Sequence, residues 1–113
     1  MTSENIFSRI VELSKTIQGN PDDVEARKER ATLLSETGML DDALADIDHV
    51  LVTLGLHDAD ALQLRGSIRM RQGDKDGAFA DLQELVKLRP EILQHLSGEY
   101  ESKKALPEFG VII

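Results

Sequence analysis

The fold follows from two short strings, Ala43-Leu44-Ala45-Asp46-Ile47 and Ala78-Phe79-Ala80-Asp81-Leu82, which carry one pattern set 35 residues apart. Residues 24–58 and 59–92 therefore look like two copies of one helical hairpin. The same offset relates further identical residues: Ala26 with Ala61, Arg30 with Arg65, and Gly38 with Gly73. Repeats of this length are typical of stacked helical arrays, in which the residues lining a shared groove vary independently of the framework. The repeat therefore favours binding over catalysis.

Composition narrows the class of protein. A chain of 113 residues is long enough for one domain with a core and too short for two of ordinary size. Aromatic residues make up 4% and Trp is absent, so the core must be built from aliphatic side chains, as in helical stacks. A net charge of −8 disfavours a protein that binds nucleic-acid phosphates, because such proteins need surplus Lys and Arg.

Location is predicted from what the sequence lacks. There is no Cys, which excludes disulfides and thiolate metal sites and fits a reducing compartment. The first residues show no signal-peptide pattern, and no window approaches the roughly 20 apolar residues of a membrane span. We expect a soluble, cytoplasmic protein with no membrane partner.

Apolar periodicity and turn residues predict helices throughout, with no strand. Asn20-Pro21-Asp22-Asp23 is expected to open one helix, and Gly38 and Gly73 to end two others in the left-handed conformation. The expected helices cover residues 4–18, 21–37, 41–54, 58–72, 75–89 and 90–104. The predicted parts of the single domain are an N-terminal packing helix (1–19), repeat one (20–58), repeat two (59–90), a C-terminal capping helix (91–105) and an apolar tail (106–113).

The two hairpins resemble the tetratricopeptide repeat (TPR) family over about residues 21–92. The residues that carry the resemblance are Gly66, Gly73, Ala78 and Pro90 in repeat two, and Ala31, Gly38 and Ala43 in repeat one. Leu62 and Arg27 stand where the family has its tryptophan. The resemblance implies an all-α, right-handed stack of helical hairpins, with about six helices once the flanking ones are counted.

The resemblance also implies where a ligand binds, because the first helix of each hairpin lines the concave groove in that family. The partner-binding candidates are therefore Glu25, Lys28, Thr32, Glu36, Gln63, Ser67, Met70 and Arg71. Their mixed charge and the adaptable Met70 thioether suit another protein, as a peptide or helix. One branch of the family clamps peptide carboxylates with Lys and Asn. Thr32 and Leu64 occupy the asparagine positions here, so we exclude that role.

Charged residues that recur between the copies are predicted to be structural. Arg30 and Arg65 share one position, and Asp46 and Asp81 share another, so each hairpin is expected to pair its Arg with the Asp on the facing helix. The rival interpretation is a basic stripe for an acidic peptide, formed by Arg65, Arg69, Arg71 and Lys75.

No pattern predicts catalysis, a metal or a cofactor. His49, His57 and His95 are scattered, and the acidic residues near them are explained by helix capping. The string from Asp74 to Gly77 lacks the ligands and the glutamate of a calcium loop. We do not expect an enzyme, and a small metal-dependent hydrolase is the remote alternative.

The last stretch, Leu106-Pro107-Glu108-Phe109-Gly110-Val111-Ile112-Ile113, is apolar on an acidic chain. We consider three roles for this tail, in order of preference: packing against the last helices, self-association, and recognition by a partner. We therefore expect a protein-protein interaction module, an adaptor or assembly subunit. The alternative is a structural homo-oligomer without a separate ligand, held through this tail.

Overall fold

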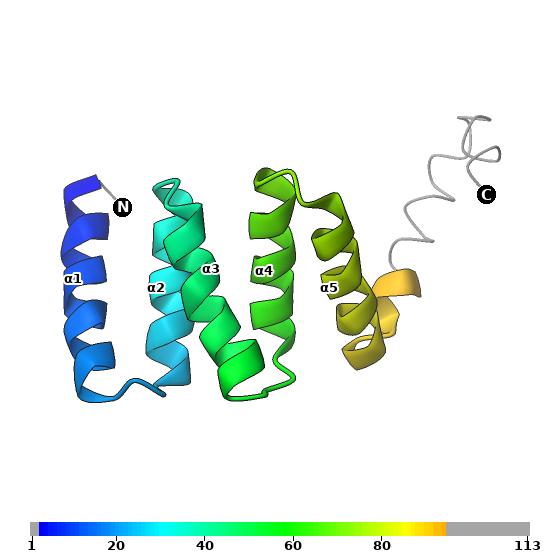
Figure 1. Ribbon diagram of the computed structural model, residues 1–113, viewed down its shortest axis with the longest axis horizontal. Coiled ribbons are helices and arrows are strands. Elements are labelled where there is room, and N and C mark those ends of the chain that lie inside the picture. The colour runs from blue at the N-terminus through cyan, green and yellow to red at the C-terminus, as the bar shows by residue number, and fades with distance from the viewer. Residues whose placement is uncertain (1–2, 95–113) are drawn as a thin grey trace.

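The computed structural model describes residues 3–94, which form a row of helices joined by short turns (Figure 1). No strand occurs among these residues, so the prediction of an all-α fold is confirmed. The elements are α1 (Ser3–Gly19), α2 (Val24–Glu36), α3 (Leu40–Asp48), the π-helix η1 (His49–Thr53), α4 (Ala59–Arg71) and α5 (Lys75–Leu88).

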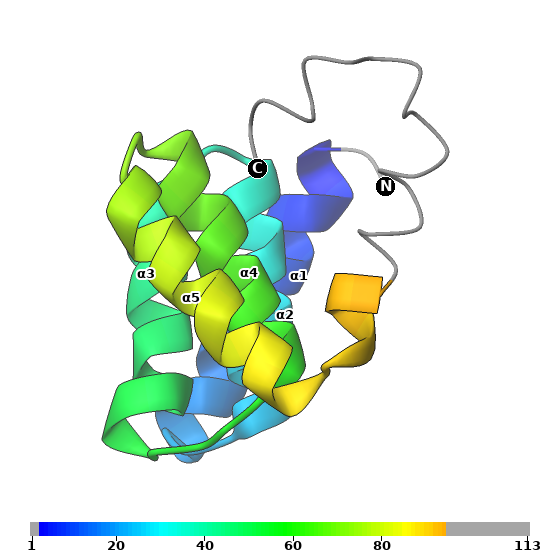
Figure 2. The same cartoon turned by 90° about the vertical axis from the view of Figure 1, so that its right-hand side faces the viewer.

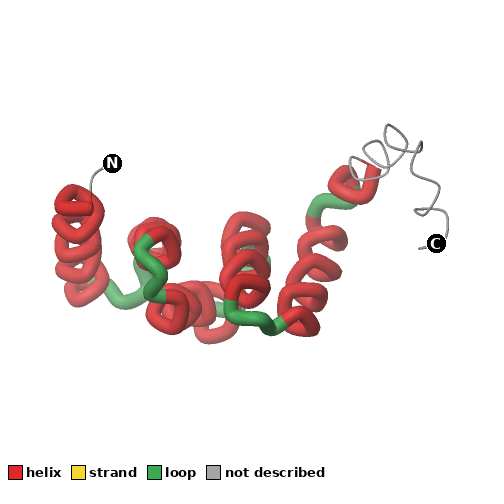
Figure 3. Tube along the Cα trace, turned by 90° about the horizontal axis from the view of Figure 1, so that it is seen from above, coloured by secondary structure: helices red, strands yellow, loops and turns green. Residues whose placement is uncertain are grey.

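The helices pair as two hairpins, α2 with α3 and α4 with α5, and α1 packs against α2. Seen from above, the row is a zigzag in which α3 lies to one side of α2 and α4 (Figure 3). The α3 helix contacts both of these neighbours, and α2 and α4 also contact each other. Viewed from the α5 end, the helices stand behind one another along the stack (Figure 2). Repeat two therefore covers repeat one.

Aspartates are the N-cap residues of three of the helices. Asp23, Asp58 and Asp74 each accept a hydrogen bond from the backbone N–H three residues later, at 3.0, 2.9 and 2.9 Å. Such caps satisfy N–H groups that have no partner inside the helix. The prediction that a helix opens at Asn20-Pro21 was early by three residues, because Asn20 instead accepts from the Asp22 N–H in a turn.

Gly38 and Gly73 end α2 and α4 as predicted, with φ of 83° and 84°. In each repeat, the backbone N–H of the residue after the glycine donates a hydrogen bond to the carbonyl oxygen five residues earlier. These bonds join Met39 to Leu34 and Asp74 to Arg69, both at 2.8 Å. This bond closes a helix whose next residue is left-handed. The two turns are thus the same in both repeats.

The predicted helix over residues 41–54 differs from the structure. It is α-helical only to Asp48 and then widens into η1, where the Leu54 N–H donates to the His49 carbonyl at 2.9 Å. Apolar spacing did not reveal this, because Ile47, Val50 and Leu51 fit an α-helical period equally well. Val50, which lies within η1, is fully buried.

The core runs between the repeats as one cluster of small and aliphatic side chains. Its buried members are Ala31, Leu34, Ala43, Ile47, Val50, Ala61 and Ile68. Ala31, Ala43 and Ala61 have no exposed surface, which shows that the helices approach closely at these positions. A second cluster, formed by Leu13, Ile17, Ala26 and Leu33, attaches α1 to α2.

Part of the predicted C-terminal organisation can be compared with the structure. Residues 91–94 form a short helical turn after α5. The rest of the predicted capping helix, to residue 105, and the apolar tail at 106–113 lie outside the described residues. Within the described part, no helix is long and apolar enough to cross a membrane.

Candidate functional site

The charged positions shared by the two repeats form buried ion pairs. Arg30 on α2 donates from Nε and Nη2 to the two carboxylate oxygens of Asp46 on α3, at 2.7 and 2.6 Å. Arg65 on α4 donates to Asp81 on α5, with its closest bond at 2.7 Å. Both aspartates are buried. The predicted pairing is therefore confirmed in each hairpin.

Each buried aspartate also binds a second arginine. Arg27 donates to Asp46 at 2.9 Å, and Arg69 approaches Asp81 at 3.1 Å. Two guanidinium groups compensate the desolvation of one carboxylate, as a buried acid requires. The hydrogen bonds to Asp46 outweigh burial and raise the pKa of Arg30.

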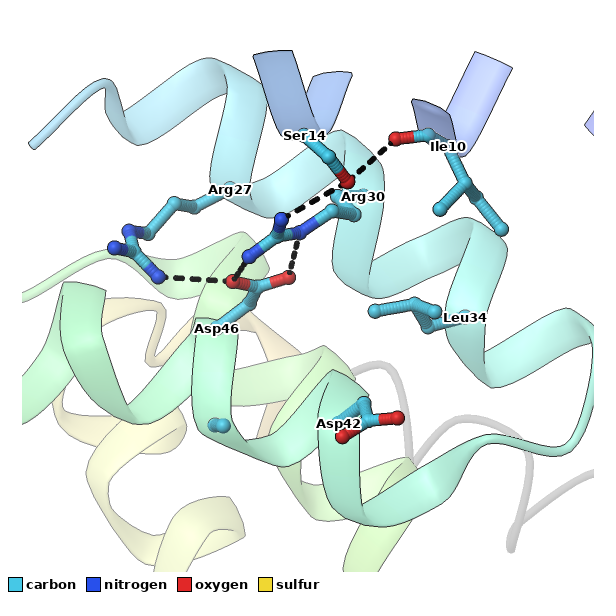
Figure 4. Close-up of a pocket in the computed structure, with 8 residues that line it drawn as sticks. Ile10, Ser14, Arg27, Arg30, Leu34, Asp42 and Asp46 are labelled. Atoms are coloured by element: carbon cyan, nitrogen blue, oxygen red, sulfur yellow. Dashed lines mark hydrogen bonds and ion pairs between the residues drawn. The ribbon is translucent and has the colours of Figure 1, made fainter. Parts of the chain in front are cut away.

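Figure 4 shows how this network reaches α1: Arg27 and Arg30 converge on Asp46, and Ser14 lies against Arg30. Ser14 accepts from Arg30 at 3.1 Å and donates to the Ile10 carbonyl at 2.7 Å. The surrounding cavity of about 320 Å³ is lined by these bonded polar groups together with Ile10, Leu34, Asp42 and Ala45. This hydrogen-bond network links α1 to repeat one.

The rival interpretation of a basic stripe for acidic peptides is not supported. Arg65 and Arg69 are held by Asp81, and Arg71 donates to the carbonyl and hydroxyl of Ser35 at 2.9 and 2.8 Å. Three of the four residues of the predicted basic stripe are therefore already bonded to other residues of the fold.

Of the predicted binding residues on α2, Glu25, Thr32 and Glu36 are exposed. Lys28 is half-buried and bonds to Asp58 of the next repeat at 3.0 Å. Burial lowers the pKa of Lys28, but the hydrogen bond to Asp58 and the nearby carboxylates outweigh burial and raise it. Lys28 therefore joins the two repeats, a role that the sequence analysis had not assigned to it.

The predicted residues on α4 divide in the same way. Arg71 joins the repeats through Ser35, while Gln63, Ser67 and Met70 lie along one groove and are exposed. Met70 is 55% exposed. Three of the eight predicted binding residues therefore line the same groove.

That groove runs between α4 and α5 and measures about 580 Å³. Residues that the sequence analysis did not propose for binding complete its lining: Leu62, Gly66, Ala78, Leu82, Leu85, Arg89 and Ile92. A usable signal was the offset of 35, since Leu82 corresponds to the core residue Ile47, but no helix among residues 3–94 covers it as α4 covers Ile47.

Gly66 sets the floor of the groove. A Cβ added there would lie 3.5 Å from the Asp81 Cβ and 3.8 Å from the Ala78 carbonyl oxygen, which is ordinary contact. The helices thus approach closely at Gly66, but an alanine fits there, just as Ala31 fits at the equivalent position.

Among residues 3–94, the histidines and acids do not gather into a metal site. His49 bonds to Asp22 at 2.9 Å. Within the described residues, no group of three or more potential ligands is close enough to hold a metal ion. Asp74 caps α5 through the Gly77 N–H, which explains the string that resembles part of a calcium loop.

Comparisons of the chain with protein-family models, curated proteins and solved structures found no match.

Proposed function

We propose that this protein is a small interaction module of the tetratricopeptide type, an adaptor or assembly subunit that binds a peptide or helix of another protein. The observation that carries the proposal is the groove between α4 and α5. It combines apolar walls with a few polar groups, Gln63, Ser67 and Arg89, which is typical of sites that receive an amphipathic helix.

The division between shared and differing positions supports this proposal. Residues that are identical in both repeats, such as Arg30 and Arg65, are engaged in the framework. Positions that differ between the copies are of two kinds. Lys28, Ser35 and Arg71 link the two repeats, whereas Gln63, Ser67 and Met70 lie exposed along the groove. Met70 is exposed in the groove, whereas its equivalent Ser35 is buried beneath α4.

The charge of the molecule indicates the chemistry of the partner. The chain carries −8 overall, while the groove is lined by the cation Arg89, whose Nη2 lies 3.7 Å from Asp60 Oδ1 in a partly exposed ion pair. A basic amphipathic helix with one acidic residue near Arg89 complements both features. Its apolar stripe would contact Leu82, Leu85 and Met70.

Selection of helical peptides on the immobilised full chain, followed by calorimetry, tests the proposal. We expect Met70→Glu to weaken binding of a selected peptide by about tenfold or more, because the change places a charge in an apolar contact. Met39→Glu is the matched control, since Met39 is 42% exposed and does not line the groove. Equal affinity of both variants would refute the groove as the binding site.

A structural homo-oligomer is the second candidate, favoured by apolar side chains at both ends of the stack. Phe7 and Val11 on α1 are 50% and 54% exposed, and Phe79 on α5 is 60% exposed. Head-to-tail packing would bury these residues. Light scattering distinguishes the two candidates, because a monomeric mass at micromolar concentration removes the oligomer.

A further inference from the structure

The α4–α5 groove is built from the same positions that receive α4 in repeat one. At the offset of 35 residues, the groove residues Leu82 and Leu85 correspond to Ile47 and Val50. Ile47 and Val50 lie in one buried cluster with residues of α4. Repeat one therefore shows, within the same molecule, a helix seated in the equivalent cleft.

The seated helix presents one face to that cleft. Ala61 and Ile68 of α4 have no exposed surface, and Leu64 packs against the same cluster from a partly buried position. Leu64 and Ile68 follow Ala61 by three and seven residues, which is the spacing of one helical face. The cleft thus receives the pattern Ala-x-x-Leu-x-x-x-Ile, in which the small first residue allows the helices to approach closely.

The ends of α4 show which way a seated helix runs. The groove residue Arg89 corresponds to Leu54, which lies in the loop that leads into α4. Met70 corresponds to Ser35, which accepts a hydrogen bond from Arg71 in the last turn of α4. A helix seated in the same way begins near Arg89, ends near Met70 and runs parallel to α4. An acidic residue in its first turn complements both Arg89 and its own helix dipole.

One difference between the copies changes the expected ligand. Ser35 is buried beneath α4 and offers its hydroxyl to Arg71, whereas Met70 at the same position offers an exposed thioether. A thioether is a weak acceptor and packs well against apolar side chains. The ligand residue ten positions after the alanine should therefore be apolar, where α4 has an arginine.

The sequence does not supply this pattern a third time. At the same offset from the alanine, leucine and isoleucine of α4, the chain carries Leu96, Glu99 and Lys103. A bulky residue replaces the small one, and two charged residues replace the aliphatic ones. The occupant that matches the groove is therefore a helix of another protein.

We propose that the α4–α5 groove recognises a partner helix that reproduces the inward face of α4. The partner carries a small residue, a leucine three residues later, an isoleucine or valine seven residues later and an apolar residue at ten, and it runs parallel to α4. This inference rests on the proposed function and names the ligand of the same site.

A synthetic peptide of residues 57–73 tests the pattern, with Gly66→Ala to favour the helix and Arg71→Leu to suit Met70. The control peptide carries Ile68→Asp in addition. Calorimetry with the full chain is expected to show saturable binding of the first peptide and at least about tenfold weaker binding of the control. No binding of the first peptide, or equal affinity of the two, would overturn the proposal.

The seat of the peptide is tested on the protein side. Met70→Glu is expected to weaken the first peptide by about tenfold, and Met39→Glu, outside the groove, to leave its affinity unchanged. An affinity that Met70→Glu does not alter would place the peptide elsewhere and overturn the proposal.

Direction is tested with a nitroxide label at either end of the peptide, because a helix of this length spans about 25 Å. We expect the label at the C-terminal end to broaden the Met70 methyl signal more strongly than the label at the N-terminal end. Equal broadening, or the reverse order, would contradict α4 as the template.

These results distinguish the inference from the proposed function. If helical peptides selected on the chain depend on Met70 but lack the α4 pattern or run in the opposite direction, the inference fails and the proposed function stands. If no selected peptide depends on Met70, the proposed function itself fails.

Discussion

The Lys28 ammonium lies 3.0 Å from the carboxylate of Asp58, the residue that caps α4. One side chain of repeat one thus helps to fix the start of repeat two. Asp58 also accepts the Ala61 N–H at 2.9 Å, so it serves the cap and the ion pair together. Docking of the repeats and folding of α4 are therefore coupled at this residue.

This pair predicts a pH dependence of stability. Burial raises the pKa of Asp58, but the Ala61 N–H and Lys28 outweigh burial and lower it. A lowered folded-state pKa contributes stability above the unfolded pKa of about 3.9, and the contribution is lost as the pH falls through the folded pKa. The raised pKa of Lys28 contributes stability below about 10.4, which is lost as the pH rises through the folded value.

Asp58→Asn isolates the charge, because Asn also caps helices. We expect it to lower the free energy of unfolding by about 1 kcal/mol at pH 7, with the difference from the unmodified chain shrinking as the pH falls from the unfolded pKa of about 3.9 through the lower folded pKa. Chemical denaturation at several pH values measures this. A difference that grows as the pH falls below about 3.9 would rule out the ion pair as its source.

The buried aspartates should be among the most sensitive polar positions. Asp46→Ala leaves the guanidinium groups of Arg27 and Arg30 without their carboxylate, and we expect a loss of about 3–5 kcal/mol. Glu84→Gln is the control, because its pair with Lys87 is exposed and should be worth less than about 1 kcal/mol. Urea unfolding of both variants gives the comparison, and similar losses would contradict the role assigned to Asp46.

Two glycines in the second hairpin should respond in opposite ways to alanine. A Cβ at Gly66 meets only ordinary contacts, so Gly66→Ala should be neutral or stabilise the protein by up to about 1 kcal/mol through helix propensity. A Cβ at Gly77 would overlap the Asp74 carboxylate that caps α5 and press on Arg69. We expect Gly77→Ala to cost about 1 kcal/mol through the lost cap. Thermal unfolding measures both, and the reverse order of stability would refute this packing.

The repeat allowed much of the framework to be predicted, because identical residues at one offset must serve the same role twice. The pairs Arg30–Asp46 and Arg65–Asp81 and the turns at Gly38 and Gly73 were predicted in this way. The π-helix η1 was not, since its apolar residues also fit an α-helix.

The site was harder to predict, because it depends on which neighbours are present. Lys28 carries a charge that could bind a ligand, but it forms an ion pair with Asp58 of the next repeat. No local sequence pattern predicts this pair. Leu82 has the spacing of a core residue and becomes a groove residue only because no described helix covers it. Exposure at the end of a stack is a property of the array and not of the hairpin.

The central claim, that the α4–α5 groove receives a helix, is tested most directly by methyl NMR of the methionines during titration with a selected helical peptide. Met70 lines the groove and Met39 does not, although both are exposed. The account predicts that the Met70 methyl signal shifts to saturation with the peptide while the Met39 signal stays in place. Saturable binding that leaves Met70 unchanged would contradict it.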